Sequence, residues 1–202
     1  RYFAPFGVFA LIAKTISSVS GDISQISEIL SALIFYMGVV ILGLFVHMGI
    51  TYMTLLKIFT TMDIKHFLKS MAPVQLLGFS TSSSGATLPV TMKRCEKDLG
   101  ISEEISSFVL PLGATINMDG TALYQGVAAV FIAQAVGMDL TLANQFTIVA
   151  TAVLASIGTA AVPGAGIIML IIILEAINVP SEGIALILGC LLYTSDAADD
   201  LL

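Results

Sequence analysis

The sequence predicts an all-α, multi-pass membrane protein with two re-entrant helical hairpins and one broken transmembrane helix. Three observations predict this class. The 202 residues are 57% hydrophobic and 11% charged, with a mean hydropathy of +1.00, whereas a soluble domain has about 25% charged residues. Three long apolar segments are interrupted by polar or helix-breaking residues. Most of the positive charge is confined to one window of the chain.

That window sets the expected orientation. Six of the eight Lys and Arg residues lie in it, at Lys57, Lys65, Lys69, Lys93, Arg94 and Lys97. By the positive-inside rule, both of its flanks face the cytoplasm. Neither Cys95 nor Cys190 has a metal-ligand spacing, and we expect no disulfide at a cytoplasmic flank.

Two apolar runs come first. Residues 1–20 are expected to be the end of a scaffold transmembrane helix, in a chain that starts without an initiator Met and that we expect to be a fragment. Residues 28–60 are expected to form one long transmembrane helix. Its 31-residue apolar run would be about 46 Å long, beyond the ~30 Å hydrocarbon core, so it must tilt or protrude. We interpret His47 within it as a packing histidine with a satisfied hydrogen bond.

Residues 65–98 are expected to form the first re-entrant hairpin. Their apolar part, 70–92, has cytoplasmic Lys or Arg on both sides, so it must enter the membrane and return. Its centre, Ser80 to Thr87, is too polar for a straight span. Backbone freed from helical pairing is tolerated at bilayer depth only inside protein or against a watery cavity. The sequence therefore places a hairpin tip at Ser82, Ser83 and Ser84.

Residues 102–136 are expected to form a broken transmembrane helix. Ser102 is the expected N-cap, with acidic residues in the first turn. The first half should end near Thr115 and the second should begin near Gly120, because a glycine and adjacent polar residues interrupt the apolar pattern.

The interruption carries the most unusual group of the chain, the carboxylate of Asp119 within the stretch Asn117-Met118-Asp119-Gly120-Thr121. A carboxylate at bilayer depth costs a few kcal/mol or more, so it usually has a partner and a function. No intramembrane Lys or Arg is available to neutralise it. We therefore expect a cation from solution to be its partner.

Residues 140–178 are expected to form a second re-entrant hairpin, entering from the opposite face. Its two apolar arms have about a dozen residues each, on either side of 156–166, and a span needs about 20. The order of hairpin, broken helix and hairpin indicates an inverted-repeat transporter with its site at the bilayer midplane.

The chain's end differs from the rest. Residues 182–189 are expected to start a last helix, but Asp196, Asp199 and Asp200 interrupt it too early for a span. The string from Cys190 to Asp200 resembles a translated library-preparation adapter. We therefore expect residues 190–202 to be a non-native tail.

Each polar cluster also has a simpler interpretation. The serines at 82–84 could be a polar loop, residues 162–166 could be only a turn, and Asn117 and Asp119 could make interhelical hydrogen bonds. Together, however, the clusters favour a binding site. Unwound carbonyls and half-helix C-terminal ends suit a hard cation such as Na+. Half-helix N-termini, such as those after Ser84 and at Gly120, bind carboxylates. The residues thus indicate a small anionic substrate beside a cation.

The string Leu110 to Gly126, LPLGATINMDGTALYQG, resembles the seventh helix of the dicarboxylate/amino acid:cation symporters, the glutamate transporter family. Ser82-Ser83-Ser84 with Thr87-Leu88-Pro89 resembles the family's first hairpin. Residues 155–159 with 162–166 resemble its second hairpin. The likeness covers residues 1 to about 189 and implies a glutamate-transporter-like fold.

The resemblance also implies roles. The substrate would be bound by the first-hairpin tip, the broken helix and the second-hairpin tip, through Ser82, Ser83, Ser84, Thr121, Val162, Pro163, Gly164, Ala165 and Gly166. Buried Na+ would be bound by Gly113, Asn117 and Asp119. A further Na+ would be bound by the carbonyls of Thr115 and Met118 together with Ser156, Ile157 and Thr159.

The function implied by the resemblance is secondary active symport, coupling inward Na+ movement to uptake of aspartate or glutamate by an elevator mechanism. The full-length protein would be a homotrimer in the cell inner membrane, in contact with the lipid bilayer and with no nucleic-acid partner. Two departures from the family pattern, Ser82 and Ala161, and the lack of the last helix leave selectivity open. The alternative is an H+- or Na+-coupled symporter of C4-dicarboxylates or neutral amino acids.

Two other classes are compatible with parts of the pattern. An intramembrane serine protease could use Ser80 as nucleophile and His47 as base, but it leaves Asp119 and the second hairpin without a role. A channel would need a continuous pore through the same polar breaks. The expected protein is therefore a transporter and not an enzyme.

Overall fold

The computed structural model describes residues 23–159, 165–184 and 187, and every regular element in these ranges is helical. The all-α class is confirmed for this part of the chain. The scaffold helix predicted for 1–20, the tail 190–202 and the tip residues Val162, Pro163 and Gly164 lie outside the described residues. The elements are α2 (Ile23–Val46), η1 (His47–Tyr52), α3 (Met53–Phe59), α4 (Ile64–Thr81), α5 (Ser84–Lys97), α6 (Glu103–Ile116), α7 (Asp119–Ala135), α8 (Leu142–Ile157), α9 (Ala165–Ala176) and η2 (Ser181–Gly183).

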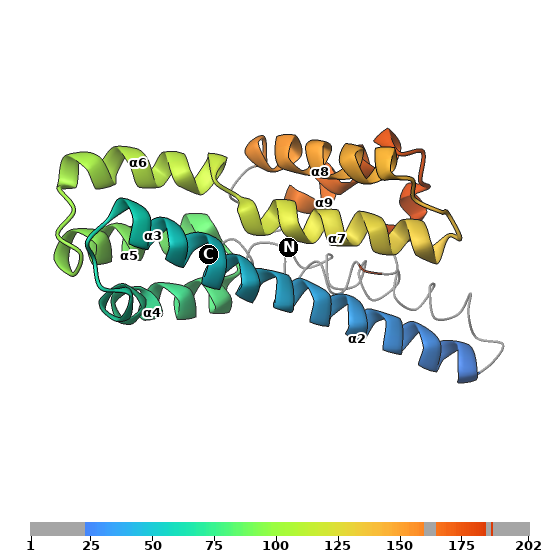
Figure 1. Ribbon diagram of the computed structural model, residues 1–202, viewed down its shortest axis with the longest axis horizontal. Coiled ribbons are helices and arrows are strands. Elements are labelled where there is room, and N and C mark those ends of the chain that lie inside the picture. The colour runs from blue at the N-terminus through green and yellow to red at the C-terminus, as the bar shows by residue number, and fades with distance from the viewer. Residues whose placement is uncertain (1–22, 160–164, 185–186, 188–202) are drawn as a thin grey trace, which may run out of the picture.

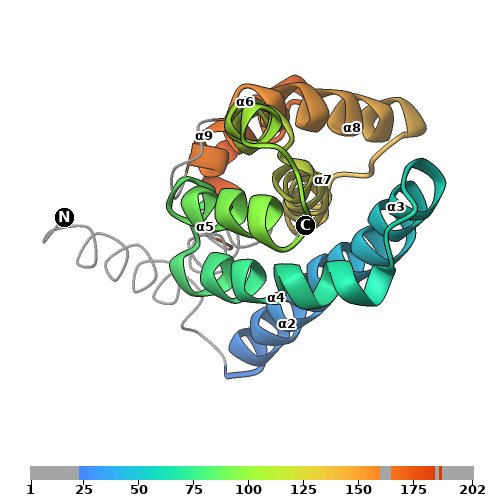
Figure 2. The ribbon, with the colours of Figure 1, turned by 90° about the vertical axis from the view of Figure 1, so that its left-hand side faces the viewer.

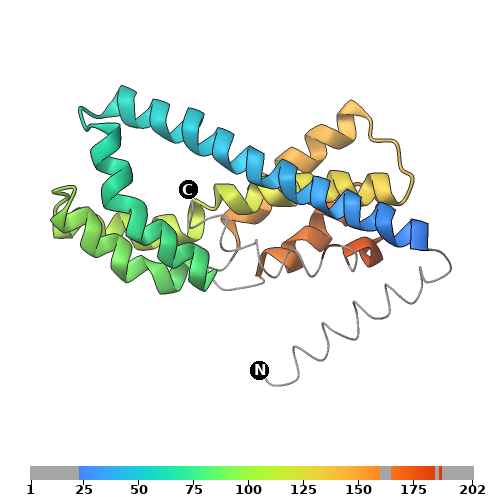
Figure 3. The ribbon, with the colours of Figure 1, turned by 90° about the horizontal axis from the view of Figure 1, so that it is seen from below.

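One long rod, formed by α2, η1 and α3, runs along most of the molecule (Figures 1 and 3). Its stretch Leu30–Phe59, 30 residues long, is long and apolar enough to cross a bilayer, and only 17% of its most apolar window is buried. Large side chains such as Ile34, Phe35, Leu42 and Phe45 are 63–74% exposed along α2. Apolar surface in water is unfavourable by about 25 cal/mol per Å², so this face suits a lipid environment.

The rod is interrupted by a π-helical segment, η1, in which backbone bonds run from residue i+5 to residue i. The amide N–H of Met53, for example, donates to the carbonyl of Met48. A π-helical turn holds one residue more than an α-helical turn, and such turns occur often at functional sites.

Helices α4 and α5 pack as an antiparallel hairpin (Figure 3), joined at one end by Ser82 and Ser83. At the other end, the ring of His66 donates from Nε2 to the carbonyl of Asp98 (2.9 Å), and Arg94 pairs with the Asp98 carboxylate (2.7 Å). The His66 bond joins the two arms where the chain enters and leaves the hairpin, whereas the Arg94 pair lies within the second arm. The end of α3, the start of α4 and the end of α5 lie at the same end of the molecule (Figure 1). The positive residues of these segments, Lys57, Lys65 and Lys97, are therefore at that end.

Helices α6 and α7 lie end to end, separated by Asn117 and Met118 (Figure 1). Ser102 is the N-cap residue of α6 as predicted, with extended backbone, but its side chain makes no capping hydrogen bond. The predicted N-cap position is confirmed, and Glu103 and Glu104 in the first turn provide the favourable charge there.

The main core lies around α7, which α2, α8 and α9 surround (Figure 2). From α2 it contains Tyr36, Val40 and Leu44, and the Tyr36 ring packs on Phe131 at 5.2 Å between centroids. Buried alanines of α7, such as Ala128 and Ala129, are 0% exposed, which allows the neighbouring helices to approach closely. The packing of α7 against these three helices thus fixes the position of the helix that begins at the interruption.

Candidate functional site

The site is centred on the interruption between α6 and α7. The last backbone bond of α6 runs from the Asn117 N–H to the Gly113 carbonyl (2.8 Å), and the first of α7 runs from the Ala122 N–H to the Met118 carbonyl (3.1 Å). A helix leaves its last carbonyls and its first N–H groups without intrahelical partners. The negative end of α6 therefore meets the positive end of α7 here, and both kinds of backbone ligand are present within a few residues.

The Asp119 carboxylate is held from the long rod. The Tyr52 hydroxyl donates to Asp119 Oδ2 at 2.7 Å, and His47 Nε2 lies 3.4 Å from the same oxygen. Sequence reasoning expected a hydrogen bond for His47, which the structure contains, but it did not predict that Asp119 is the acceptor. It missed Tyr52 entirely. A cation in solution is therefore not the only partner available to Asp119.

Tyr52 also contacts the second polar side chain of the interruption. Asn117 Nδ2 donates to the Tyr52 hydroxyl at 3.3 Å. No periodic signal points to this cluster, because residues five apart in an α-helix face directions about 140° apart. The π-helical turn brings His47 and Tyr52 to one side, and their rings meet edge to face at 5.2 Å between centroids.

The N-terminal end of α5 faces the interruption across a cavity of about 470 Å³. Ser82 has a left-handed backbone (φ 48°), and Ser83 is the N-cap of α5, accepting from the Ala86 N–H at 3.3 Å. Ser84 is 9% exposed, and its hydroxyl has no hydrogen-bond partner among the described residues. A buried hydroxyl left unpaired is costly, which marks Ser84 as a ligand-binding candidate.

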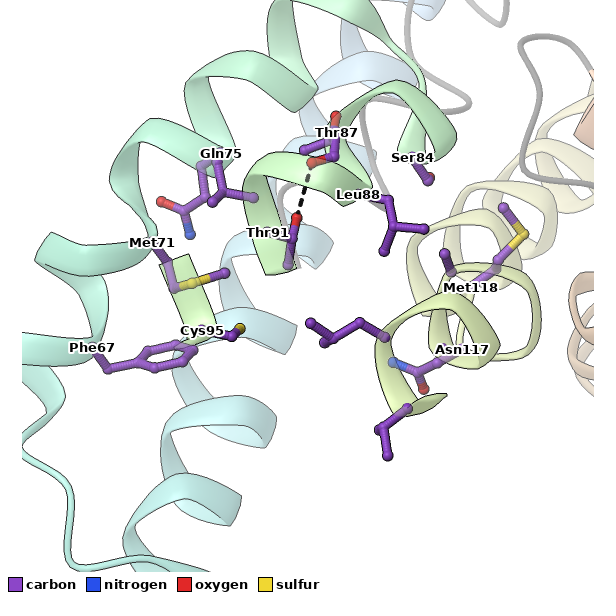
Figure 4. A pocket seen from close by; sticks show the side chains of 15 residues that line it. Phe67, Met71, Gln75, Ser84, Thr87, Leu88, Thr91, Cys95, Asn117 and Met118 are labelled. Atoms are coloured by element: carbon purple, nitrogen blue, oxygen red, sulfur yellow. Dashed lines mark hydrogen bonds between the residues drawn. The ribbon is translucent and has the colours of Figure 1, made fainter. Parts of the chain in front are cut away.

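Side chains of α4, α5 and α6 line this cavity (Figure 4). Its polar lining comes from Gln75, Ser84, Thr87, Thr91 and Asn117, and the remaining walls are mostly apolar. The hydroxyls of Thr87 and Thr91 are already used, donating to the carbonyls of Ser83 (2.9 Å) and Thr87 (3.2 Å). Ser84 is therefore the hydroxyl of the cavity that still has a proton to donate to a ligand.

The C-terminal end of α8 approaches α6 (Figure 1). The predicted ion ligands Ser156 and Thr159 are buried there, at 4% and 3% exposure, and their hydroxyls donate to the carbonyls of Val153 (2.9 Å) and Ala155 (2.8 Å). The side chain of Ile157 is 46% exposed. Because a hydroxyl that donates retains its lone pairs, both hydroxyl oxygens can still face a cation.

The start of α9 packs against α7. A Cβ built on Gly166 would overlap the Tyr124 hydroxyl and lie 3.4 Å from Thr121. Gln125 Nε2 donates to the Gly166 carbonyl at 2.9 Å, while its buried Oε1 has no partner among the described residues. Thr121, predicted to bind substrate, is 1% exposed and adjacent to this contact. Ala165 is the first residue of α9.

The structure thus brings the predicted residues together in two groups that meet at the interruption. Ser84 shares a cavity with Gly113, Asn117 and Met118, and Thr121 meets the start of the second hairpin at Gly166. The pair required by a serine protease is not formed: the Ser80 hydroxyl donates to the Leu77 carbonyl at 2.9 Å, while His47 contacts Asp119. That alternative has no support in the geometry.

Interrupted helices that place a carboxylate and free backbone ends beside a cavity are the arrangement of ion-coupled membrane transporters. Comparison with known proteins identifies the family to which this chain belongs. Residues 1–194 match the model of the sodium:dicarboxylate symporter family, and the chain belongs to this family.

The chain is also similar to excitatory amino acid transporters. It is 44% identical over 187 residues to excitatory amino acid transporter 3 of Mus musculus, covering 93% of this chain and 35% of that protein. It is 39% identical over 188 residues to excitatory amino acid transporter 2 of Homo sapiens, covering 93% and 32%. It is 38% identical over 188 residues to an excitatory amino acid transporter of Caenorhabditis elegans, covering 93% of this chain and 37% of that protein. The chain spans about a third of the length of these relatives.

Proposed function

We propose that this chain forms the binding region of a secondary active symporter that couples inward Na+ movement to uptake of acidic amino acids. The observation that carries the proposal is the cavity next to Asp119, with Asn117 on one wall and, on another, the buried Ser84 hydroxyl, which has no hydrogen-bond partner among the described residues. The family's description supports sodium coupling, and the names of the relatives support an amino acid as substrate.

The cation part of the site uses oxygen donors. In the described part of the chain no three His, Cys, Asp or Glu side chains gather to hold a metal ion, so the donor set at the interruption consists of carboxylate, amide, hydroxyl and carbonyl oxygens. Such donors suit a hard cation. Asp119, Asn117 and the Gly113 carbonyl would bind one Na+. A second Na+ would be bound where α6 meets α8, by Thr115, Met118, Ser156, Ile157 and Thr159.

The anion part of the site is the tip of the first hairpin. The N-terminal N–H groups of α5 carry a partial positive charge that attracts a carboxylate. Ser83 and Ser84 would bind the α-carboxylate there, beside Ser82, and Thr121 would contact the substrate side chain. The second-hairpin tip, Val162, Pro163, Gly164, Ala165 and Gly166, would cover the bound substrate.

Coupling follows from the charges. A carboxylate substrate next to Asp119 would be repelled unless a cation binds in between. Each ligand therefore raises the affinity for the other by the same factor, as linkage requires. Na+ would therefore be co-transported: it moves down the Na+ gradient together with the substrate.

The arrangement in the bilayer belongs to the same proposal. Helices α8 and α9 have 16 and 12 residues, fewer than the ~20 needed to span, so each pair, α4–α5 and α8–α9, would enter and return as a re-entrant hairpin. In the full-length protein, a homotrimer in the inner membrane, the region from 28 onward would move as an elevator against a static scaffold.

The test is transport by the full-length protein in proteoliposomes. We expect aspartate and glutamate uptake to depend on an inward Na+ gradient. Asp119→Asn should raise the Na+ concentration that gives half-maximal uptake by tenfold or more. Asp139→Asn, the same change at an exposed turn, is the matched control. Unchanged uptake in sodium-free buffer would refute Na+ coupling. Preference for succinate or alanine in the same assay would assign the site to dicarboxylates or neutral amino acids instead.

A further inference from the structure

Tyr52 is neither a proposed Na+ ligand nor a proposed substrate ligand, yet its hydroxyl contacts two of the proposed Na+ ligands. It donates to Asp119 Oδ2 at 2.7 Å and accepts from Asn117 Nδ2 at 3.3 Å. The residue comes from the long rod, 67 positions before Asp119. Its place at the interruption depends on the π-helical turn.

The direction of these hydrogen bonds is fixed by chemistry. An ionised carboxylate can only accept, so the Tyr52 hydroxyl must give its single proton to Asp119. The hydroxyl is then an acceptor toward Asn117, and the Asn117 side chain must present its NH2 group to it. The carbonyl oxygen of the Asn117 amide consequently points away from Tyr52.

This orientation leaves the oxygens that a cation needs unobstructed. Both contacts to Asp119 fall on Oδ2, and Oδ1 has no hydrogen bond to another described residue. The 2.7 Å bond from Tyr52 is short and charge-assisted, whereas the 3.4 Å hydrogen bond from His47 is long and therefore weaker. Tyr52 is therefore the principal group fixing the carboxylate.

We propose that Tyr52 is a positioning residue of the cation site, whose hydroxyl orients Asp119 and Asn117 so that one oxygen of each faces the bound Na+. The inference rests on the proposed function. Partners that orient metal ligands in this way commonly change metal affinity by about 10–100-fold when removed. Tyr52 would thus act on Na+ affinity without touching Na+ or substrate.

The test measures Na+ binding without transport. Thermal unfolding of the full-length protein is followed while NaCl replaces choline chloride, in the absence of substrate, because a bound ion raises the unfolding temperature. We expect Tyr52→Phe to raise the half-saturating Na+ concentration about tenfold or more, and also to lower the unfolding temperature in choline, because the charge-assisted hydrogen bond to Asp119 is lost.

Tyr36→Phe is the matched control, the same change on the same rod but in the core against Phe131, and its half-saturating Na+ concentration should equal that of the wild type. In an Asn117→Ala background, Tyr52→Phe should have a smaller effect, because one of the two groups it orients is absent. If Tyr52→Phe lowers the unfolding temperature in choline but leaves half-saturation unchanged, Tyr52 only stabilises the fold and the inference is wrong. No stabilisation of the wild type by Na+ would overturn both the inference and the proposed function.

Discussion

Asp119 is the residue on which the account depends, and its two carboxylate oxygens have different surroundings. Oδ2 is held by Tyr52 and approached by His47, whereas Oδ1 is available to a ligand. The carboxylate, 40% exposed at the side chain, lies in the first turn of α7. This arrangement is compatible with the proposed role of Asp119 as a Na+ ligand.

A prediction at this scale concerns Ser84. Its hydroxyl is buried and has no hydrogen-bond partner in the described part of the chain, so Ser84→Ala should leave the stability of the ligand-free protein unchanged or slightly higher. Aspartate affinity should fall by roughly 10- to 100-fold, because a hydrogen bond to a charged group contributes about 1.5–3 kcal/mol. Thermal unfolding and binding titration of the full-length protein measure the two effects.

The matched control is Thr87→Val, three residues along the same helix. Its hydroxyl already donates to the Ser83 carbonyl, so this change should destabilise the ligand-free protein by about 1 kcal/mol and affect aspartate affinity less. If Ser84→Ala destabilised the protein without weakening aspartate binding, Ser84 would be a structural residue and not a ligand.

The residues of the site could be predicted from the sequence only where the signal is local. The carboxylate at Asp119 and the serines at 82–84 stand out because polar groups interrupt apolar segments. Tyr52 and Gln125 could not be predicted, because their partners lie 67 and 41 positions away. Their roles depend on how the helices pack, and an isolated Tyr or Gln in a helix carries no such information.

At the scale of elements, the interruptions were predictable and the π-helical turn was not. Gly and polar residues in a row predicted a break between Thr115 and Gly120, and α6 ends at Ile116 with α7 starting at Asp119. In contrast, η1 has an ordinary apolar sequence, HMGITY. A π turn is an α-helix with one residue inserted, and nothing local in these six residues distinguishes the two.

The π turn leads to a prediction about deletions. Removing Gly49 from η1 would place His47 and Tyr52 four residues apart, which is one face of an α-helix, so both should still reach Asp119. Na+-driven aspartate uptake by the full-length protein should persist. Deleting Gly38 instead should abolish it, because the shift rotates the preceding part of α2 by about 100° relative to the core.

Both glycines have open space around a built Cβ, so the two deletions differ mainly in helix register. Equal loss of uptake in the two variants would show that the extra residue itself is required. Circular dichroism and thermal unfolding of both variants show whether the helices remain folded.

The contact between α7 and α9 leads to another prediction. Gly166→Ala should destabilise the protein by about 1–3 kcal/mol, because the new methyl group meets the Tyr124 hydroxyl. In the double variant Gly166→Ala/Tyr124→Phe the total loss should be smaller than the sum of the single losses. Denaturant unfolding of the four proteins measures the difference, and simple additivity would contradict a direct clash.

At the scale of the whole molecule, apolar surface and charge are separated in a way that suits a membrane. The rod exposes apolar side chains along α2. The Lys and Arg residues of the positive window lie at one end of the molecule, where the start of α4 meets the end of α5. Composition was sufficient to predict a membrane protein, and the lengths of the apolar runs predicted the helices found in the described part of the chain. The meeting of the α5 N-terminus with the interruption between α6 and α7 could not be derived from composition, since it requires the packing of α5 against α6.

The most direct test is the affinity of the purified full-length protein for aspartate, titrated calorimetrically at a series of Na+ concentrations. We expect the aspartate dissociation constant of the wild type to fall steeply as Na+ rises, and to depend much less on Na+ in Asp119→Asn, because the interruption binds the cation that the substrate needs. Identical dependence on Na+ in the two proteins, or none in the wild type, would contradict the account.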